Sequence, residues 1–510
     1  MRALISTYDK TGIDAFARGL ERLGWSLVAS GGTAAYLEDI GVHVEHVDAL
    51  TESPEMLGGR VKTLHPRIHA GILARRDNAD DVLTLEEHGI EPFDLVCVNL
   101  YPFEDVAARQ GVTEAEAVEM IDIGGPSMLR GAAKNFAHVI PVCRPDRYGF
   151  VLDELQRHGE ISIDTRRELA AEAFAATAAY ESAIAMWFAD REAFPETLAL
   201  AFDKVLDLSY GENPHQRAAY YTERGARSHL LSRVEQLHGK ALSFNNLNDL
   251  SAARLVCREF TLPACVIVKH ANPCGVAVGA TIEEAYDKAL ASDPVSAYGG
   301  IVVLNRDVDA ALGEKLAEQF VEVLFAPGYE EGALEALRRR QGTRIIVDHE
   351  RRRPAAQQRG LKRVLGGLLV QDADAEIEDR DGWEVVAGSP DERQWGDLVF
   401  GWRVCKHVLS NAIVVVKDLA TIGVGAGQMS RVDAVRIALD KAVEHGHDPV
   451  GSALASDAFF PFPDGPELAL SRGVRAIVQP GGSKRDDLVI AAVADAGATM
   501  VFTGRRHFRH

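Results

Sequence analysis

The stretch VIVKHANPCGVAVG, residues 266–279, decides the fold of the second half of this 510-residue chain, because a closely related stretch follows later. It aligns without gaps with VVVKDLATIGVGAG at 414–427, which lies 148 positions further on (414 − 266). Each copy runs into a helical pattern and then reaches a Ser-Asp pair, at 292–293 and at 456–457. Self-similarity at a fixed distance indicates a duplicated structural unit. We therefore predict two homologous α/β subdomains with a ligand-binding cleft between them.

A lysine and a histidine, Lys269 and His270, end the apolar run of the first copy. Placing either charge at the end of a buried strand needs a reason. Successive strand residues point to opposite faces, so the two side chains can share a site only if the chain bends, and Pro273 predicts such a bend. A nearby ammonium would then favour the neutral imidazole that a general base requires. A purely structural pair is the alternative.

Cys274 follows in a Pro-Cys-Gly sequence that is similar to part of the zinc deaminase signature. That signature needs an upstream H-x-E and a second cysteine where this chain has Ala277, so a zinc ligand has no partner here. We predict a small packed residue. All six cysteines are scattered, mostly in apolar runs, which is typical of reduced thiols in a cytosolic protein.

The first 145 residues alternate short apolar runs such as RALIST and FDLVCVNL with helical patterns. Unbroken apolar strands predict a mostly parallel sheet covered on both faces, and hence a doubly wound α/β domain. An alanine-rich helical stretch at 165–192 closes this domain. We predict domains at 1–196 and 197–510, the second divided into subdomains at about 197–370 and 371–510.

Polar residues follow the strands of the first domain, at the edge where parallel sheets bind ligands. The segments STYDKTG and SGGT can present backbone N–H groups and a lysine to a phosphate, and GGRVKTLHP adds a basic cluster. Taken singly, each segment is also compatible with an ordinary turn, solvated charges or an exposed helix face. The candidates are Ser6, Lys10, Ser30, Gly31, Thr33, Arg60, Lys62, Thr63, Tyr101, Asp122 and Lys134.

The net charge and the absence of several motifs disfavour some classes of function. The formal net charge of −20 disfavours nucleic acid and anionic membranes as partners. No run of about 18 apolar residues and no signal peptide occur, so we expect a cytoplasmic protein. The P-loop and the G-x-G-x-x-G fingerprint are also absent, which makes the phosphate part of a small substrate.

Taken in order, these motifs resemble the family of bifunctional purine-biosynthesis enzymes that join phosphoribosylaminoimidazolecarboxamide (AICAR) formyltransferase to IMP cyclohydrolase. The resemblance covers essentially the entire chain. The motifs that carry it are STYDKTG, SGGT, GGRVKTLHP, NLYPF, IDIGGPSMLRGAAKN, YGENPHQ, VKHANPCG, APGYEE, GAGQMSR, SDAFFPF and FRH. It implies a methylglyoxal-synthase-like N-terminal domain, two cytidine-deaminase-like subdomains without zinc, and a formyltransferase site at a homodimer interface.

The resemblance also implies roles in formyl transfer. His270 would be the general base on the 5-amino group of AICAR as this group attacks 10-formyltetrahydrofolate. Lys269 would tune His270 and support charge in the tetrahedral intermediate, while Asn411 would hold the oxyanion or the leaving nitrogen. Asp457 would bind the pterin ring. The positions that match the nucleotide site are Tyr210, Asn213, Asn246, Arg431, Arg506, Phe508 and His510.

For ring closure of formyl-AICAR to IMP, the resemblance makes Asp122 the acceptor of the amide proton. Lys134 and Tyr101 would polarise the formyl oxygen. Lys62 belongs to the same catalytic group and also helps to hold the nucleotide. The other N-terminal candidates would bind the nucleotide, chiefly its phosphate.

One departure from the family stands at Ser209, where the family usually has an arginine that grips the AICAR phosphate. The alternative function is therefore a nucleotide-binding protein that retains cyclohydrolase activity but has a weakened formyltransferase. The resemblance implies no transition metal and leaves a monovalent-cation requirement open.

Overall fold

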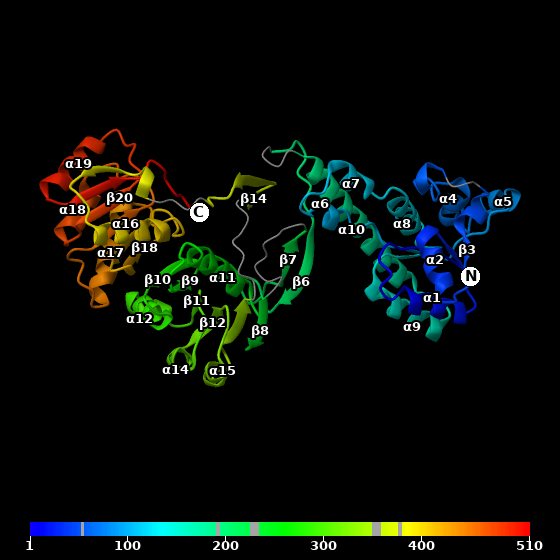
Figure 1. The fold of residues 1–510 in the computed structure, drawn as a ribbon, viewed down its shortest axis with the longest axis horizontal. Helices are drawn as coiled ribbons and strands as arrows, with labels where there is room; N and C mark the ends of the chain where they lie inside the picture. The colour runs from blue at the N-terminus through cyan, green and yellow to red at the C-terminus, as the bar shows by residue number, and fades with distance from the viewer. Residues whose placement is uncertain (53–55, 190–193, 225–233, 349–358, 376–379) are drawn as a thin grey trace. The chain divides into compact units, whose positions relative to one another are not determined.

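The computed structural model describes residues 1–52, 56–189, 194–224, 234–348, 359–375 and 380–510. These residues form two units, Met1–Asp203 with Glu223–Gly225, and Lys204–Thr222 with Ala226–His510 (Figure 1). We call them unit 1 and unit 2. The domain boundaries that we place at 196/197 and 370/371 stay predictions.

Unit 1 is built on a parallel five-stranded sheet of order β3-β2-β1-β4-β5. Its strands are β1 (Arg2–Ser6), β2 (Ser26–Ala29), β3 (Glu45–His46), β4 (Leu95–Val98) and β5 (Ile140–Val142). Its helices are α1 (Ile13–Arg22), α2 (Gly31–Asp39), α3 (Val47–Thr51), α4 (Pro66–Leu73), α5 (Ala79–Glu87), α6 (Phe103–Ala107), α7 (Glu114–Glu119), α8 (Gly124–Lys134), α9 (Tyr148–His158) and α10 (Ile163–Phe188).

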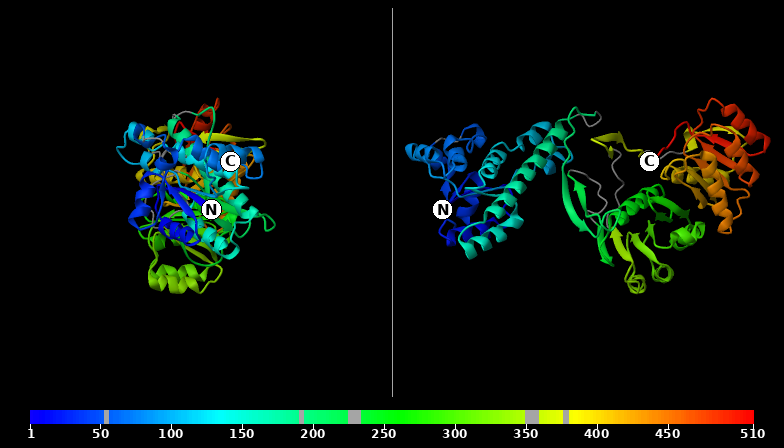
Figure 2. Two further views of the ribbon diagram at one scale, coloured as in Figure 1. Left: turned by 90° about the vertical axis from the view of Figure 1, so that its right-hand side faces the viewer. Right: turned by 180° about the vertical axis from the view of Figure 1, so that it is seen from behind.

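The apolar strands of unit 1 are buried on both faces. Ile5 packs in a core with Phe16 of α1, whereas the neighbouring Leu4 packs in a second core with Leu129 of α8. Because consecutive residues need apolar partners on opposite sides, the strands read as unbroken apolar runs. The doubly wound parallel sheet that the sequence predicts is thereby confirmed. The closing helix is α10, the long helix in the right-hand view of Figure 2; residues 190–192 of its predicted span lie outside the described residues.

Unit 2 contains a twelve-stranded sheet of order β16-β21-β20-β19-β17-β18-β10-β9-β11-β12-β13-β8. Its strands are β8 (Val234–His238), β9 (Ala264–Lys269), β10 (Asn272–Val278), β11 (Gly300–Leu304), β12 (Val321–Ala326), β13 (Arg344–Asp348), β16 (Glu384–Ala387), β17 (Ile413–Lys417), β18 (Ala420–Gly425), β19 (Ala453–Ser456), β20 (Ala476–Gln479) and β21 (Thr499–Phe502). Two separate two-stranded sheets pair β6 (Phe202–Leu208) with β7 (Ala218–Glu223), and β14 (Arg359–Val364) with β15 (Gly367–Asp372).

The strand order of the large sheet is symmetrical about the pair β10–β18. Reading outward from this pair, β9 corresponds to β17, β11 to β19, β12 to β20, β13 to β21 and β8 to β16. The two halves join through an antiparallel pairing of Ala277 with Ala420. The duplication that the sequence predicts is therefore visible in the sheet, while the likeness to cytidine deaminases stays a prediction.

Helices cover the two faces of this sheet unequally. The helices are α11 (Phe244–Cys257), α12 (Ile282–Ser292), α13 (Pro294–Ala297), α14 (Ala310–Glu318), α15 (Glu331–Arg338), α16 (Glu392–Cys405), α17 (Arg431–Glu444), α18 (Asp464–Ser471) and α19 (Asp486–Asp495). Leu250 of α11 and Leu398 of α16 belong to one core shared by both halves. Leu312 of α14 and Leu439 of α17 belong to separate cores, one for each half.

Two glycines related by the shift of 148 positions make equivalent contacts with a helix, although the contacted helix residues differ by 149 positions (438 − 289). A Cβ atom on Gly275 would lie 2.0 Å from the carbonyl oxygen of Ala289, and one on Gly423 would lie 1.9 Å from that of Ala438. In both copies only glycine allows a helix to pack this closely on the sheet.

The correspondence of the two Ser-Asp pairs is wrong. Ser292 is the last residue of helix α12, whereas Ser456 is the last residue of strand β19. Helix α12 has 11 residues and its counterpart α17 has 14, so the constant shift is lost after the repeated stretch. A two-residue match beyond that point therefore carries no structural information.

Candidate active sites

The loops that follow β1 and β2 in unit 1 are tied together by polar contacts. The hydroxyl oxygens of Ser6 and Ser30 lie 2.7 Å apart. The ammonium of Lys10 donates to Thr33 Oγ1 at 3.0 Å and to the carbonyl oxygen of Thr7. Burial lowers the pKa of Lys10. Four of the predicted residues thus meet at the carboxyl end of this sheet.

Lys62 reaches the first turn of α2. Gly31 has a φ of +42°, and a Cβ atom on it would lie 2.3 Å from the Lys62 ammonium nitrogen. Only a glycine leaves this space. A cation beside the free N–H groups of a helix N-terminus makes a site for an anion, as predicted for the phosphate.

The neighbouring Thr63 lies against the start of α8. A Cβ atom on Gly124 would come within 2.2 Å of the Thr63 hydroxyl oxygen. Lys62 and Thr63 therefore bridge the start of α2 and the start of α8. This connection brings the phosphate candidates close to Asp122.

Asp122 is half-buried just before α8. One of its carboxylate oxygens accepts from the N–H of Gly125 at 2.8 Å. Burial raises the pKa of Asp122, against the opposing effect of backbone N–H groups that include that of Tyr101. The pKa of Tyr101 is raised as well, first by burial and then by the charge of Asp122. A carboxylate that binds a proton more readily than usual suits a general base.

Two predicted residues lie apart from this group. Arg60 is exposed and pairs with the exposed Glu119. Lys134 is the exposed last residue of α8, so about 15 Å of helix separates it from the end next to Asp122. Its position gives no support to a contact with the Asp122 site within one copy of the chain.

In unit 2, the Lys269–His270 pair stands at a hairpin turn. Strand β9 ends at Lys269 and β10 begins at Asn272, so the turn consists of His270 and Ala271, with φ of 53° and 60°. The expected bend is therefore present, but it lies at these two residues and not at Pro273, which belongs to β10. Two consecutive residues of the left-handed region make the turn that matches strand twist. Because neither is glycine, the turn costs about 1–2 kcal/mol per residue.

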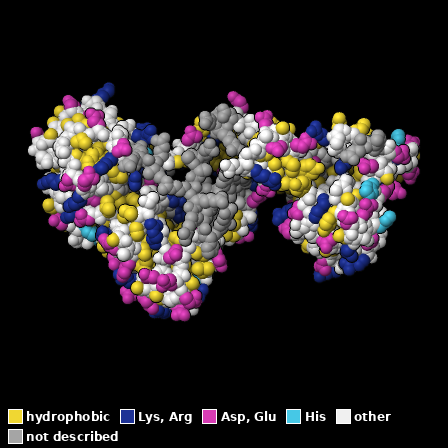
Figure 3. Space-filling view, viewed as in Figure 1, with side chains coloured by type: hydrophobic (Ala, Val, Ile, Leu, Met, Phe, Trp, Pro, Cys, Tyr) yellow, Lys and Arg dark blue, Asp and Glu magenta, His cyan; other side chains and the backbone are white. Residues whose placement is uncertain are grey.

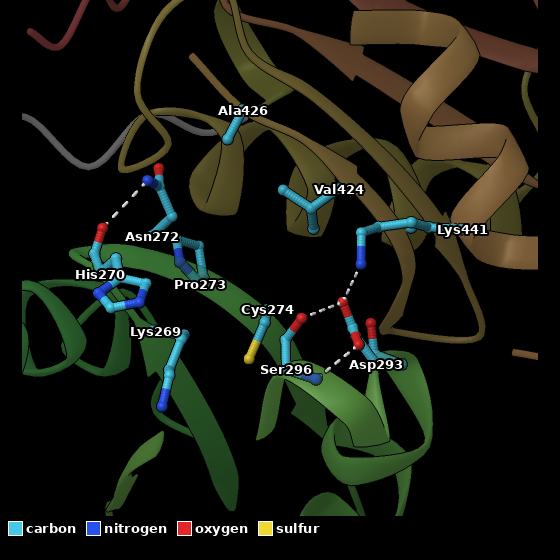
Figure 4. Close-up of a pocket in the computed structure, with 12 residues that line it drawn as sticks. Lys269, His270, Asn272, Pro273, Cys274, Asp293, Ser296, Val424, Ala426 and Lys441 are labelled. Carbon is cyan, nitrogen blue, oxygen red and sulfur yellow. Dashed lines mark hydrogen bonds and ion pairs between the residues drawn. The ribbon is translucent and has the colours of Figure 1, made fainter. Parts of the chain in front are cut away.

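The two side chains of the pair extend in different directions (Figure 4). The Lys269 ammonium donates to the carbonyl oxygens of Tyr298 at 3.2 Å and Gly299 at 2.9 Å. His270 is exposed at the rim of a cavity of about 210 Å³ that Asp293 and Lys441 also line. The structure thus places both residues at one cavity without a direct contact between them.

Cys274 also lines this cavity, and it packs against the core of the first half. Its thiol donates to the carbonyl oxygen of Ile267 at 3.5 Å. Burial raises the pKa of Cys274 to about 12, which disfavours the thiolate that a nucleophile or a metal ligand requires. Among the described residues, no cluster of three histidine, cysteine or acidic side chains is placed to hold a metal ion.

A second group of predicted residues surrounds Asn411. The Arg431 guanidinium donates to Asn411 Oδ1 at 2.7 Å and to Ser456 Oγ at 2.8 Å, and it pairs with Asp457. Asp457 is fully buried and also accepts from the hydroxyl of Ser410. Its carboxylate therefore faces protein partners, and its contact with a pterin stays a prediction.

A cavity of about 480 Å³ adjoins this group. Asn411, Arg431, Arg506 and Phe508 line it, with the Arg506 guanidinium 4.5 Å from the centre of the Phe508 ring. The ring of His510 lies 5.7 Å from that of Phe508. With Asp457, six of the residues predicted for formyl transfer are thus clustered.

A hydrogen bond connects the two groups of unit 2. Asn272 Oδ1 accepts from the N–H of Leu409 at 3.0 Å. Asn272 is two residues from His270, and Leu409 is two residues from Asn411. The general-base candidate and the oxyanion candidate are therefore on adjoining segments.

The remaining nucleotide candidates have hydrogen-bond partners outside the two groups of residues around His270 and Asn411. Asn246 is buried, accepts from the N–H of Ser243 at 3.0 Å and donates to Glu322 at 2.9 Å, so its amide serves the start of α11. Asn213 is exposed in the loop that follows β6. The carbonyl oxygen of Tyr210 accepts from the backbone of α11. Their nucleotide contacts stay predictions.

The sequence places Asp249 with Asn246 among the polar residues that suggest a shared pocket, but it indicates no specific role. The structure shows that the Asp249 carboxylate accepts from the N–H groups of His270 at 3.1 Å and Ala271 at 2.8 Å. The signal that points to it is the repeat, because Asp397 stands 148 positions later and makes the same contacts to the second turn. Asn272 was also missed, and it has no such counterpart, since Ala420 takes its place.

No helix in the described ranges is both long and apolar enough to cross a membrane. Acidic side chains are spread over both units on the face shown in Figure 3. Lysines nevertheless lie at the candidate sites, Lys62 in unit 1 and Lys269 and Lys441 at the smaller cavity of unit 2. A parallel α/β unit with an anion site beside a buried carboxylate, joined to a duplicated α/β unit with an exposed histidine turn, defines an enzyme with two separate sites for small molecules.

Comparison with known proteins identifies this enzyme more closely. The family model "AICARFT/IMPCHase bienzyme" matches residues 132–441, and the model "MGS-like domain" matches residues 12–127. The chain is 48% identical over 512 aligned residues to each of two relatives named "Bifunctional purine biosynthesis protein PurH", from Bacillus cereus (strain B4264) and Bacillus mycoides (strain KBAB4). Each alignment covers 100% of this chain and 99% of the relative. The chain belongs to the AICARFT/IMPCHase bienzyme family.

A solved structure, titled "Crystal structure of ForH", also matches the chain. It is 41% identical, covers 37% of this chain and 99% of its own, and has a TM-score of 0.34.

Proposed function

We propose that this chain catalyses the last two steps of IMP biosynthesis, with one site in each unit. Unit 2 transfers the formyl group of 10-formyltetrahydrofolate to the 5-amino group of AICAR, and unit 1 closes formyl-AICAR to IMP with loss of water. The observation that carries the proposal is the 48% identity to the PurH relatives along the full chain. The test supplies the purified protein with AICAR and 10-formyltetrahydrofolate and follows IMP. Formation of neither IMP nor formyl-AICAR would contradict it.

The first step is the attack of a weakly nucleophilic amine on the formyl carbon. The resulting intermediate then breaks its bond to the folate nitrogen, which takes up a proton and leaves as tetrahydrofolate. His270 accepts the amine proton, because its turn places the imidazole at the rim of the cavity. The negative charge that develops on the formyl oxygen needs a fixed donor. Asn411 supplies it: Arg431 holds its amide oxygen, and one of its two N–H groups donates to Gln428 at 2.8 Å, which leaves the other for the substrate.

The second step is intramolecular, so orientation contributes much of the rate. The anion site formed by Gly31 and Lys62 holds the nucleotide phosphate. Asp122 takes the proton of the carboxamide as its nitrogen attacks the formyl carbon, and Tyr101, next to it, donates to the formyl oxygen. The position of Lys134 at the far end of α8 does not support its predicted share in this step within one copy.

A substitution at Ser209 tests the alternative function, in which the chain binds nucleotide but has a weakened formyltransferase. Its hydroxyl donates to the carbonyl oxygen of Leu242 at 3.1 Å, and the residue is exposed. A guanidinium here would form charge-assisted hydrogen bonds to phosphate, each contributing about 1.5–3 kcal/mol. We expect Ser209→Arg to lower the KM for AICAR roughly tenfold or more, measured by steady-state formyl transfer. An unchanged KM would show that the phosphate does not bind near this residue.

We also propose that the chain acts as a homodimer in the cytoplasm and that the hairpin β14–β15 contributes to the interface. Within the described residues, these two strands pair only with each other. An isolated hairpin is marginally stable in water, and exposed apolar groups mark interaction surfaces. Leu365 is fully exposed and Leu369 is 58% exposed. The hairpin also carries Arg359, Lys362 and Arg363, which complement a second copy of a chain with a net charge of −20.

The double variant Leu365→Asp/Leu369→Asp should shift the protein from dimer to monomer, because it places two charges in an apolar contact. Light scattering after size-exclusion chromatography measures this change. The control is Leu488→Asp, at a leucine of α19 that is 52% exposed, close to the value for Leu369, and this variant should stay dimeric. A monomeric wild-type protein, or a double variant that dimerises normally, would refute the proposal.

A further inference from the structure

The duplication of unit 2 contains a second copy of the histidine turn, which serves as an internal control. Asp418 and Leu419 form the turn between β17 and β18 with φ of 54° and 57°. Their N–H groups donate to Asp397 at 3.2 Å and 2.8 Å. The first turn repeats this arrangement with His270, Ala271 and Asp249.

The lysines at the two turns behave alike as well. Lys417 donates to the carbonyl oxygens of Asp448 at 3.0 Å and Val450 at 2.9 Å, just as Lys269 donates to two carbonyl oxygens before β11. The lysine and the aspartate therefore serve the hairpin in both copies. The functional difference at the turn is His270 in the first copy and Asp418 in the second.

The anchoring aspartate is held in place by its helix. Asp249 lies in α11, which begins at a capping box and packs Leu247 and Leu250 into the shared core. Its two carboxylate oxygens each accept one N–H group, and both N–H groups belong to residues of the left-handed turn. Because a carboxylate only accepts, it matches two converging donors better than an amide does. Burial raises the pKa of Asp249, mainly against the effect of these two N–H groups.

We propose that Asp249 is a positioning residue for formyl transfer, because its carboxylate fixes the His270–Ala271 turn and so holds the imidazole at the rim of the cavity. The inference rests on the proposed function of unit 2. It assigns Lys269 to the same task through its bonds to Tyr298 and Gly299. Only His270 then contacts the substrate at this turn.

The test compares Asp249→Asn with the matched variant Asp397→Asn. Each keeps one acceptor and sets an NH2 group against the other N–H donor. A displacement of about 1 Å in a catalytic group costs about 100-fold in rate. We therefore expect Asp249→Asn to lower the kcat of formyl transfer by about 10- to 100-fold with little change in the KM for AICAR. Asp397→Asn should lose a similar amount of thermal stability but keep its formyl transfer.

A second substitution distinguishes loss of His270 positioning from a general loss of structure in unit 2. Glycine adopts positive φ without steric cost, so Asp249→Asn/Ala271→Gly should regain part of the lost kcat. Ring closure of supplied formyl-AICAR reports on intact folding of unit 1 in every variant. Equal loss of formyl transfer in both aspartate variants, full activity of Asp249→Asn, or no rescue by Ala271→Gly would overturn the inference. A wild-type protein without formyl transfer would instead refute the proposed function itself.

Discussion

His270→Ala should abolish formyl transfer while ring closure continues. Alanine leaves the backbone of the β9–β10 turn and its hydrogen bonds to Asp249 possible, but it removes the imidazole that accepts the amine proton. Positioned general-base catalysis typically contributes about 10²- to 10⁴-fold, and we expect a loss of this size in kcat. The measurement follows formyl-AICAR formation from AICAR and 10-formyltetrahydrofolate. Supplied formyl-AICAR should still be converted to IMP at the wild-type rate, because we assign that reaction to unit 1.

The second copy of the turn supplies the control for this variant. Asp418→Ala makes the equivalent change at the exposed counterpart of His270, with the same left-handed backbone and the same aspartate anchor. It should cost similar stability and leave formyl transfer intact. Loss of both activities in His270→Ala would contradict separate sites. Retention of formyl transfer in His270→Ala would place the base elsewhere.

The duplicated fold could be predicted from the sequence, whereas the shape of the turn could not. The shift of 148 positions relates β9 to β17 and β10 to β18, and the duplication that it predicts accounts for the symmetrical strand order of the sheet. The turn was missed because His270–Ala271 and Asp418–Leu419 lack the Asn-Gly or Gly signals of a two-residue hairpin. Their positive φ is stabilised by distant aspartates, which local sequence does not reveal.

Among the site residues, too, some could be predicted from local sequence and others could not. Ser30, Gly31 and Thr33 are adjacent in sequence and form one turn, so their common role follows from local pattern. Asp457 follows strand β19 in a loop whose local sequence does not reveal an ion pair, yet it is fully buried against Arg431, which lies 26 residues earlier and was predicted only as a nucleotide contact. Its environment depends on how strands β17 and β19 come together, and no local pattern encodes that.

Asp122→Asn should remove ring closure and leave formyl transfer unchanged. The amide cannot accept the carboxamide proton, so we expect a loss of about 10²- to 10⁴-fold in the rate of IMP formation from formyl-AICAR. The amide oxygen of asparagine can still accept from the N–H of Gly125, so the start of α8 should be retained. The matched control is Asp105→Asn, an exposed carboxylate of the same unit, which should retain both activities.

The pH dependence of ring closure tests the same assignment. Burial raises the pKa of Asp122 in the folded protein. The base works only when deprotonated, so the rate should fall as the pH drops through this raised pKa, and hence at a higher pH than the ordinary aspartate value of about 3.9 would give. The rate of formyl transfer by unit 2 should not fall in this pH range. This difference distinguishes titration of Asp122 from acid unfolding of the protein. An acidic limb at the ordinary carboxyl value, or one that persists in the residual activity of Asp122→Asn, would assign the proton transfer to another group.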